Sequence, residues 1–509
     1  MVCVGGRPLT LHEFQKVLYN GENVGLSEEG TKKVNESFEF LEAFSKDKII
    51  YGINTGFGPM AQYRIEDVDR KELQYNLIRS HASGAGTPLE PLYVRATMLA
   101  RLNTLAQGYS GIHISTLEVI CELINKKVTP LIFEHGGVGA SGDLVQLAHL
   151  ALVIIGEGEC FYEGKKRDTK EVFEELNIKP LVIKNREGLA LMNGTSCMTG
   201  IGLINVTLAR KVVRWGVEAS CLINELVGTY NDHYSKELNR AKYHKGQRQV
   251  ADLMASYLAS SKMVKTRKDH LYQGDHTEDI FEEKVQEYYS LRCVPQILGP
   301  VLDTVSFSKK VLTEEVNSGN DNPIIDVETQ NVYHGGNFHG DYVALEMDKL
   351  KIAVTKASML AERQLNFLMN HNLNNILTPF VNRGKLGFNF GMQGVQFTAV
   401  STTAENQMLS NPMYVHSIPN NNDNQDIVSM GTNAALITKK VIDNSFEVLS
   451  ILFMSLTMAV DILECKDKLS ETSQKVYEEI REVFPTFVDD HPKYNEVRKV
   501  KEYLMKKDI

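Results

Sequence analysis

The sequence predicts an all-α protein with a loop-rich N-terminal part, and three observations support that fold class. Prolines number only 14 in 509 residues, fewer than the roughly 5% of average proteins. Two very long stretches contain neither proline nor glycine, so a helix can continue through each of them. Apolar residues recur along both stretches in alternating steps of three and four, which is typical of helices that bury one face.

The longest helices are expected in the second half of the chain. The first proline-free and glycine-free stretch runs from Asp341 to Thr378, and the second from Thr432 to Phe484. We expect the two helices to pack against each other in a bundle. A third helix is expected over Met198 to Leu226, where apolar residues at helical spacing outweigh three glycines. The chain after about residue 200 is therefore predicted to be mainly helical.

The first 200 residues have a different character. Glycine-bearing loops alternate there with shorter helices such as Tyr93 to Gln107, and brief strands are expected at Lys48 to Tyr51 and Leu131 to Phe133. We predict three domains along the chain, namely an N-terminal domain over 1–200, a central bundle of long helices over 201–475 and a C-terminal helical segment over 476–509.

Composition limits the classes of function. The net charge of -9 gives no basic excess to neutralise phosphates, so nucleic acid is not expected as a partner. No basic N-terminal region precedes an apolar run, and no stretch approaches the roughly 18 apolar residues of a membrane span, so we expect a cytoplasmic protein. The seven cysteines contain no CxxC pair and the histidines lack ligand spacing, so no metal is expected.

A glycine-rich segment, His135 to Asp143, runs directly into the apolar helix expected at Leu144 to Ile155, with Asp143 at its N-cap. Its glycines satisfy GxGxxG, the pattern of a dinucleotide-binding turn. However, Pro130 interrupts the strand that should precede such a turn, and the chain lacks alternating strands and helices. We therefore expect no nucleotide at this segment.

The tripeptide Ala140-Ser141-Gly142 offers a second interpretation, in which it condenses on itself. The backbone nitrogen of Gly142 must attack the carbonyl carbon of Ala140, and a residue without Cβ leaves that approach open. Dehydration of Ser141 then leaves an exocyclic methylidene. The product is 4-methylidene-imidazol-5-one, an electrophile that no ordinary side chain supplies. The tripeptide alone is too short to be diagnostic, so the surrounding sequence must decide.

Over nearly its whole length the sequence resembles the histidine, phenylalanine and tyrosine ammonia-lyase family, and most of all bacterial tyrosine ammonia-lyases. Seven segments carry the resemblance in order: Tyr51 to Gly58, Gly139 to Asp143, Gly188 to Thr195, Tyr289 to Cys293, Asn320 to Pro323, Gly335 to His339, and Asn424 to Asp426. The resemblance implies the ammonia-lyase/fumarase-like fold, with the self-made prosthetic group in the domain 1–200. It also implies a homotetramer with shared active sites.

The resemblance also assigns the reacting groups. The substrate amine adds to the methylidene carbon derived from Ser141, and Tyr51 is the base that removes the β-proton. Arg292 grips the substrate carboxylate, for which its planar guanidinium is suited. The alternatives are that Tyr51 is an interfacial core aromatic and Arg292 part of a surface ion pair, but the motif around Tyr51 favours catalysis.

Further residues are assigned to substrate binding by the same resemblance. Tyr289 and Gln286 line the amine and carboxylate side, Asn193 donates to the imidazolone oxygen, and Asn322 belongs to the NDNP segment. Phe338 is expected to pack on the prosthetic ring, although a lone aromatic residue is more often part of the core.

The side-chain pocket of the family corresponds here to Ser80-His81 and to Gln425. Histidine lyases share the Ser-His pair but carry a carboxylate at the second place. Phenylalanine-specific members usually have an apolar pair at the first place, where His81 would lie desolvated against a phenyl ring. Tyrosine uses both features, because His81 can bond its phenol and the neutral Gln425 tolerates its ring. His81 as a satisfied core histidine remains the alternative.

The sequence therefore predicts elimination of ammonia from L-tyrosine to give trans-p-coumarate. Two other reactions stay open, namely a histidine ammonia-lyase that forms urocanate and a tyrosine 2,3-aminomutase that returns ammonia to the β-carbon. A catalytically inert helical oligomer is a remote alternative, against which the intact Ala140-Ser141-Gly142 and Tyr51 speak.

Overall fold

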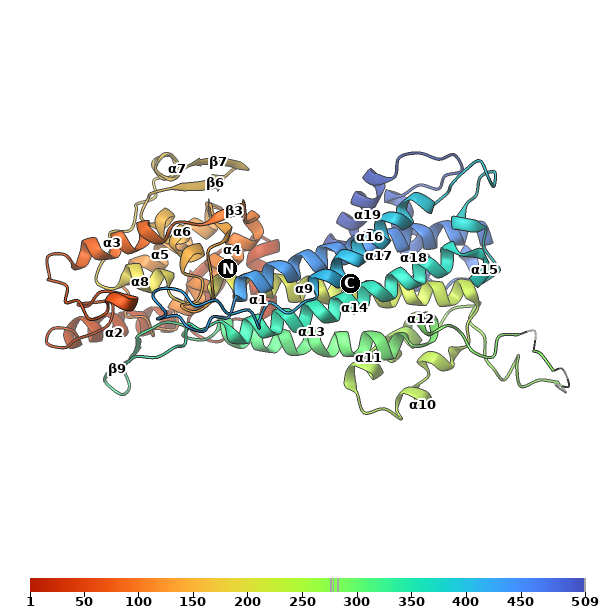
Figure 1. Cartoon of the computed structure of the whole chain (residues 1–509), viewed down its shortest axis with the longest axis horizontal. Helices are drawn as coiled ribbons and strands as arrows, with labels where there is room; N and C mark the ends of the chain where they lie inside the picture. The colour runs from red at the N-terminus through yellow and green to blue at the C-terminus, as the bar shows by residue number, and fades with distance from the viewer. Residues whose placement is uncertain (275–276, 278, 282, 508–509) are drawn as a thin grey trace. The chain divides into compact units, whose positions relative to one another are not determined.

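The computed structural model describes residues 1–507 except 275, 276, 278 and 282, and helices dominate it (Figure 1). The helices are α1 (Leu11–Tyr19), α2 (Glu28–Phe44), α3 (Arg70–His81), α4 (Pro91–Leu105), α5 (Ile114–Asn125), α6 (Leu144–Ile154), α7 (Thr169–Leu176), α8 (Glu187–Met192), α9 (Ser196–Val227), α10 (Lys236–Asn239), α11 (Lys245–Tyr257), α12 (Tyr289–Arg292), α13 (Val294–Val316), α14 (Asp341–Met369), α15 (His371–Asn374), α16 (Gln393–Leu409), α17 (Gly431–Leu463), α18 (Glu471–Val483) and α19 (Tyr494–Lys506). Single 3-10 turns lie at Gly58–Met60, Asn231–Tyr234, Pro379–Val381 and Lys466–Lys468.

The strands are short and form small separate sheets. They are β1 (Val2–Val4), β2 (Val24–Leu26), β3 (Ala85–Pro88), β4 (Thr129–Pro130), β5 (Phe133–His135), β6 (Glu159–Tyr162), β7 (Lys165–Asp168), β8 (Ile324–Asp326) and β9 (Asn331–Tyr333). β1 pairs with β2 in parallel, whereas β3 with β5, β4 with β6 and β7, and β8 with β9 pair antiparallel. The predicted all-α class is confirmed.

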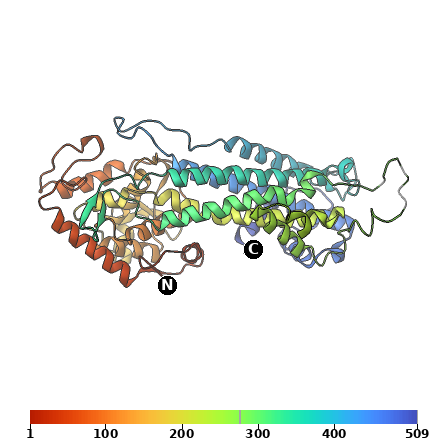
Figure 2. The same ribbon diagram turned by 90° about the horizontal axis from the view of Figure 1, so that it is seen from below.

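The chain groups into two compact units, each drawn from three stretches of sequence. The first unit comprises Met1–Asn205, Ser308–Asp348 and Pro412–Thr438, and the second comprises Val206–Phe307, Lys349–Asn411 and Lys439–Ile509. Figure 2 shows the short helices and loops of the first 200 residues in red to yellow. These units interleave along the chain and do not correspond to contiguous domains. The three contiguous domains of the sequence analysis stay a prediction.

The two longest predicted helices are present but shorter than the proline-free stretches. α14 ends at Met369 rather than Thr378, because Asn370 leaves the helix and its side chain caps α15. α17 ends at Leu463, and Glu464 takes a left-handed backbone conformation. The rest of the stretch predicted to reach Phe484 forms α18, which the hydroxyl of Ser470 caps.

The N-terminal predictions differ in outcome. α4 and α6 lie within a few residues of their predicted bounds. The strand expected at Lys48 to Tyr51 is wrong, because that segment is a loop that enters a turn at Tyr51. The strand expected at Leu131 to Phe133 overlaps β5 only at its last residue.

Buried helices form the core of each unit. In the first unit, the Asn205 side-chain amide donates to the Ala435 carbonyl at 2.8 Å. In the second, the Trp215 indole donates to the Leu504 carbonyl at 2.8 Å. α17 is long and apolar enough to cross a membrane by length and composition alone, yet 78% of its most apolar window is buried inside the protein. That burial is expected of a core helix.

Candidate active site

The first turns of several helices meet at the segment 138–143. α6 starts directly after this segment, α14 and α17 start directly after residues bonded to it, and the first turn of α9 bonds Asp143. Gly340 N–H donates to the Gly139 carbonyl at 3.1 Å, and Met430 N–H to the Val138 carbonyl at 3.0 Å. Asp143 N–H donates to the Gly194 carbonyl at 2.8 Å. Helix N-termini carry partial positive charge, so this arrangement favours negative charge at the segment.

Gly142 occupies a position that only glycine fits. Its φ is +72°, and a Cβ there would overlap the carbonyl oxygen and carbon of Gly194. Ala140, by contrast, is buried in an apolar cluster with Val428 and Met430. The tripeptide is therefore held on both sides, by backbone at its glycine and by side chains at its alanine.

Ser141 receives hydrogen bonds at both of its oxygens. Gln425 Nε2 donates to its hydroxyl oxygen at 2.8 Å, and Asn193 Nδ2 donates to its carbonyl oxygen at 3.1 Å. Closure between Gly142 N and the Ala140 carbonyl carbon would leave this Ser141 carbonyl oxygen on the ring. Asn193 would then donate to the oxygen that the ring retains. Its own buried Oδ1 has no hydrogen-bond partner among the described residues. The residues present fit the prosthetic group.

Asp143 does more than start the next helix. The sequence predicted that its side chain would cap α6, but it makes no capping hydrogen bond there. It accepts instead from Cys197 N–H at 2.8 Å and Met198 N–H at 2.9 Å, in the first turn of α9. Thr432 Oγ1 donates to its other oxygen. Burial raises the pKa of Asp143 to about 6, and these three hydrogen bonds oppose that rise.

Tyr51 lies in a loop that folds back on itself. Its hydroxyl accepts a hydrogen bond from Gly58 N–H at 3.0 Å, and its ring meets Phe57 edge-on at 6.0 Å between centroids. The Tyr51 backbone N–H points to Nε2 of His334 at 3.4 Å. Tyr51 is half-buried, and its role as the base stays a prediction.

Ser80 and His81 lie at the end of α3 in the same unit. Ser80 is exposed and His81 half-buried, so His81 is not enclosed in the core. His81 Nδ1 lies 2.9 Å from the Leu77 carbonyl oxygen. A carbonyl oxygen only accepts, so Nδ1 donates and Nε2 of the neutral ring remains an acceptor.

Asn322 and Phe338 also belong to the first unit. Asn322 Oδ1 accepts from Gly335 N–H at 2.9 Å, which ties the NDNP segment to the segment that carries Phe338. Phe338 is half-buried and stands two residues before Gly340, which bonds the Gly139 carbonyl.

Gln286, Tyr289 and Arg292 belong to the second unit, whereas the tripeptide belongs to the first. Tyr289 and Arg292 stack, with the guanidinium carbon 4.8 Å from the ring centroid. Gln286 is exposed and Tyr289 is 69% exposed. Arg292 Nε is buried and has no hydrogen-bond partner in the described part of the chain. The pair therefore combines an exposed aromatic ring with a guanidinium whose buried Nε is unsatisfied.

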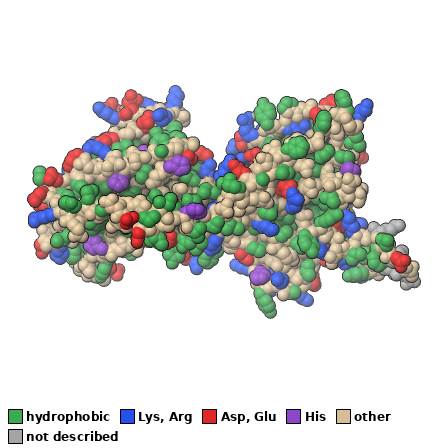
Figure 3. All heavy atoms as spheres, in the orientation of Figure 1, with side chains coloured by type: hydrophobic (Ala, Val, Ile, Leu, Met, Phe, Trp, Pro, Cys, Tyr) green, Lys and Arg blue, Asp and Glu red, His purple; other side chains and the backbone are tan. Residues whose placement is uncertain are grey.

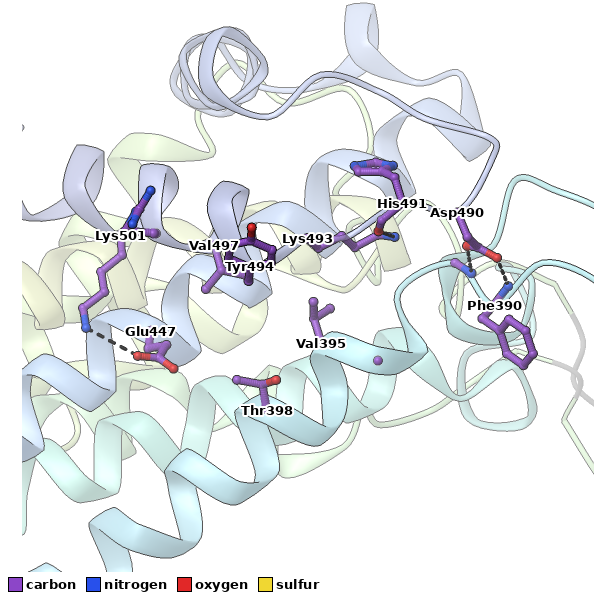
Figure 4. Close-up of a pocket in the computed structure, with 13 residues that line it drawn as sticks. Phe390, Val395, Thr398, Glu447, Asp490, His491, Lys493, Tyr494, Val497 and Lys501 are labelled. Atoms are coloured by element: carbon purple, nitrogen blue, oxygen red, sulfur yellow. Dashed lines mark hydrogen bonds and ion pairs between the residues drawn. The ribbon is translucent and has the colours of Figure 1, made fainter.

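A cavity of about 600 Å³ lies elsewhere in the second unit, between α16, α17 and α19 (Figure 4). Its charged groups already have partners. Asp490 accepts from Phe390 N–H at 2.7 Å and from Gly391 N–H at 3.0 Å, and Lys501 pairs with Glu447 at 3.4 Å. None of the predicted site residues lines this cavity. In the described residues, no group of three or more His, Cys, Asp and Glu side chains is placed to hold a metal ion.

Two residues of this site were missed from the sequence. Ser429 Oγ donates to the Gly139 carbonyl at 3.0 Å, and Thr432 bonds Asp143. Both flank the start of α17, so the local signal was a pair of hydroxyls at a helix N-terminus. Nothing in the sequence indicated that they would serve a segment almost 300 residues away.

Comparisons with known proteins give one family. A family model described as aromatic amino acid lyase matches residues 9–482. The chain is 37% identical to tyrosine 2,3-aminomutase of Chondromyces crocatus, over 98% of this chain and 96% of that protein. It is 37% identical to histidine ammonia-lyase of Caldanaerobacter subterraneus subsp. tengcongensis, over 97% of this chain and 95% of that protein. The solved tyrosine aminomutase of Streptomyces globisporus has a TM-score of 0.95 at 34% identity, over 99% of this chain and 96% of that one.

Proposed function

The chain belongs to the aromatic amino acid lyase family, and within it we propose that the protein eliminates ammonia from L-tyrosine to give trans-p-coumarate. The neutral Gln425 amide, which lies 2.8 Å from the Ser141 hydroxyl, supports tyrosine over histidine. The choice of tyrosine over phenylalanine is carried by His81, whose Nδ1 lies 2.9 Å from the Leu77 carbonyl oxygen. A carboxylate at position 425 would suit the imidazole of histidine. The Gln425 amide is uncharged, so a neutral phenol ring can pack beside it without removing water from a charge.

The tripeptide forms the electrophile by losing two waters. Gly142 N bonds to the Ala140 carbonyl carbon, whose oxygen leaves as water, and Ser141 loses its hydroxyl as the second water. The resulting 4-methylidene-imidazol-5-one supplies an electrophilic carbon for the substrate amine. Asn193 holds the Ser141 carbonyl oxygen, and the helix N-termini around it favour the charge that flows there.

The other groups bind the substrate and move its proton. Tyr51 removes the β-proton. To do so, its hydroxyl gives up the hydrogen bond from Gly58 N–H and turns to the substrate. His81 Nε2 accepts the phenol O–H, because Nδ1 is committed to Leu77. Arg292, backed by Tyr289 and Gln286, binds the carboxylate, and Phe338, Asn322 and Ser80 complete the lining.

A second candidate is tyrosine 2,3-aminomutase activity, which the name of the Chondromyces crocatus relative favours. The two reactions share the elimination and differ in whether ammonia returns to the β-carbon. The histidine ammonia-lyase relative is equally identical to this chain, so histidine belongs in every assay.

One experiment separates these functions. Purified enzyme is given L-tyrosine, L-phenylalanine and L-histidine in parallel, and products are followed by ultraviolet absorbance and chromatography. We expect trans-p-coumarate to form fastest. Faster urocanate would overturn the substrate, and β-tyrosine as the main product would make the enzyme an aminomutase.

We further infer a homotetramer in which subunits share active sites, in a cytoplasmic location. The exposed ring of Tyr289, which stacks on Arg292, supports a site completed by another chain. Apolar side chains are exposed on one face of α16, at Phe397, Val400 and Met408, and hydrophobic side chains appear on the surface in Figure 3. Light scattering should give about four times 57.2 kDa, and a fully active monomer would contradict the proposal.

A further inference from the structure

A buried guanidinium lies directly behind the turn Asn193–Gly194. Arg101, on α4, is fully buried. Its Nη1 donates to Asn320 Oδ1 at 3.2 Å, and its Nη2 donates to the Ala190 carbonyl. Burial lowers the pKa of Arg101 to about 10, so the group stays cationic at neutral pH. Its two acceptors are neutral, and no carboxylate of the described residues pairs with it directly. Burial of this charge therefore costs stability.

Arg101 completes the end of α8. This helix ends at Met192, and a further turn would have bonded Gly194 N–H to the Ala190 carbonyl. Gly194 N–H instead points to the Ser141 carbonyl at 3.4 Å. Arg101 takes the carbonyl that Gly194 leaves, and a cation is favoured at a helix C-terminus. The guanidinium thus frees Gly194 to face the tripeptide.

Gly194 is enclosed on two sides. On one side its carbonyl lies where a Cβ on Gly142 would be, and on the other a Cβ of its own would overlap Asn320 Oδ1 and crowd Arg101 Nη1. Movement of the guanidinium or of Asn320 would therefore let Gly194 move away from Gly142.

The same network holds the residue that follows Gly194. Asn320 Nδ2 donates to Thr195 Oγ1 at 2.8 Å, and Thr195 Oγ1 donates to half-buried Glu315. Arg101 and Asn320 together therefore fix the chain before and after Gly194, at Ala190 and at Thr195. Every group in this chain of contacts belongs to the first unit.

We propose that Arg101 is a positioning residue that presses the Asn193–Gly194 turn against Ser141 and Gly142 and so sets how completely the tripeptide closes. This inference rests on the prosthetic group of the proposed function. Ring closure requires Gly142 N to lie against the Ala140 carbonyl carbon, and a misplacement of about 1 Å can slow such a step roughly a hundredfold.

The test measures ring closure by mass and does not depend on activity. Wild type, Arg101→Met, Arg101→Lys and Arg95→Met are purified, and folding is checked by circular dichroism and cooperative melting. The peptide that spans Ala140–Gly142 is then weighed. Arg95 is the matched control, because it lies on the same helix and donates to the Val17 and Leu18 carbonyls, away from the turn.

We expect wild type and Arg95→Met to lack the mass of two waters throughout, and Arg101→Met to show at least a tenfold smaller closed fraction. Arg101→Lys should lie between them, because an ammonium reaches one partner but not two. Complete closure in folded Arg101→Met would overturn this inference alone. Full mass in active wild type would refute the prosthetic group and the inference together.

If Arg101→Met does not fold, Asn320→Ala replaces it. That variant removes the oxygen that accepts from Arg101 Nη1 and the amide that donates to Thr195 Oγ1, and it keeps the guanidinium. A reduced closed fraction supports the proposal, and complete closure overturns it.

Discussion

Two regions of the first unit differ sharply in how they are held. The tripeptide Ala140–Gly142 is buried or half-buried, its neighbours receive backbone hydrogen bonds from Gly340 and Met430, and a Cβ at Gly142 would overlap Gly194. His81, at the specificity end, is half-buried and bonded only near itself, to Ser80 and Leu77. Backbone contacts among distant segments define the first region, whereas single side chains define the second.

The difference explains why one scaffold serves several substrates. Ser141 supplies the hydroxyl whose loss would form the electrophile, so a change there should remove the reaction. His81 bonds Ser80 and Leu77, so a change there alters one or two contacts. The similar identities to a tyrosine aminomutase and to a histidine ammonia-lyase are consistent with that division. Five substitutions test it, from the largest expected effect to the smallest.

Ser141→Ala should abolish turnover, with a loss on the order of 10³-fold or more, because only dehydration of that side chain creates the electrophile. The fold should remain, since Ser141 contributes one hydroxyl contact, to Gln425. Steady-state kinetics and peptide mass provide the measurement. Ser429→Ala, which removes a hydroxyl bonded to Gly139, is the control and should retain the prosthetic group.

Tyr51→Phe should keep the prosthetic group and lose about 10²- to 10⁴-fold in kcat, the range for a lost general base. The variant also leaves Gly58 N–H without its acceptor. Tyr75→Phe controls for that loss, because the hydroxyl of Tyr75, on α3, likewise accepts from a backbone N–H, that of Ile183, at 3.2 Å. Near-normal turnover in Tyr51→Phe would assign the base elsewhere.

His81→Phe should lower the preference for tyrosine over phenylalanine several-fold, because one neutral hydrogen bond is worth about 0.5–1.5 kcal/mol. The drop should pass about a hundredfold if no water replaces the imidazole. Gln425→Glu should admit histidine modestly and harm both aromatic substrates, since its carboxylate must be desolvated or protonated. kcat/KM for three amino acids on both variants decides. An unchanged ratio in His81→Phe would remove the main support for tyrosine.

Asp143→Asn should change the pH dependence of stability. The Asp143 pKa is raised from 3.8 to about 6 by burial, so the folded state binds this proton more tightly than the unfolded state. Stability from this group is therefore full below about pH 4, falls as the pH rises to about 6, and is constant above. Urea unfolding from pH 4 to 7 should show the wild-type-minus-variant free energy falling by on the order of 3 kcal/mol. A constant difference would mean that Asp143 titrates normally.

The sequence alone determined the fold class, the long helices and the tripeptide. These depend on local information, because the absence of proline and glycine, apolar spacing and a glycine third in Ala140-Ser141-Gly142 can be read within one segment. Local reading failed where helices end. α17 ends at Leu463, before Glu464, and α14 ends at Met369, before Asn370. Neither stretch contains a proline or glycine that would have predicted these ends.

Only the tertiary structure decided which distant groups meet the tripeptide. Asp143 caps a helix 54 residues away instead of its own, and Arg101 reaches Asn320, 219 residues along the chain. Gln425 contacts Ser141 across 284 residues. Such contacts follow from how helices pack, and one sequence carries no spacing rule for pairs so far apart. The residues that hold the reactive turn in place therefore became visible only in the folded chain.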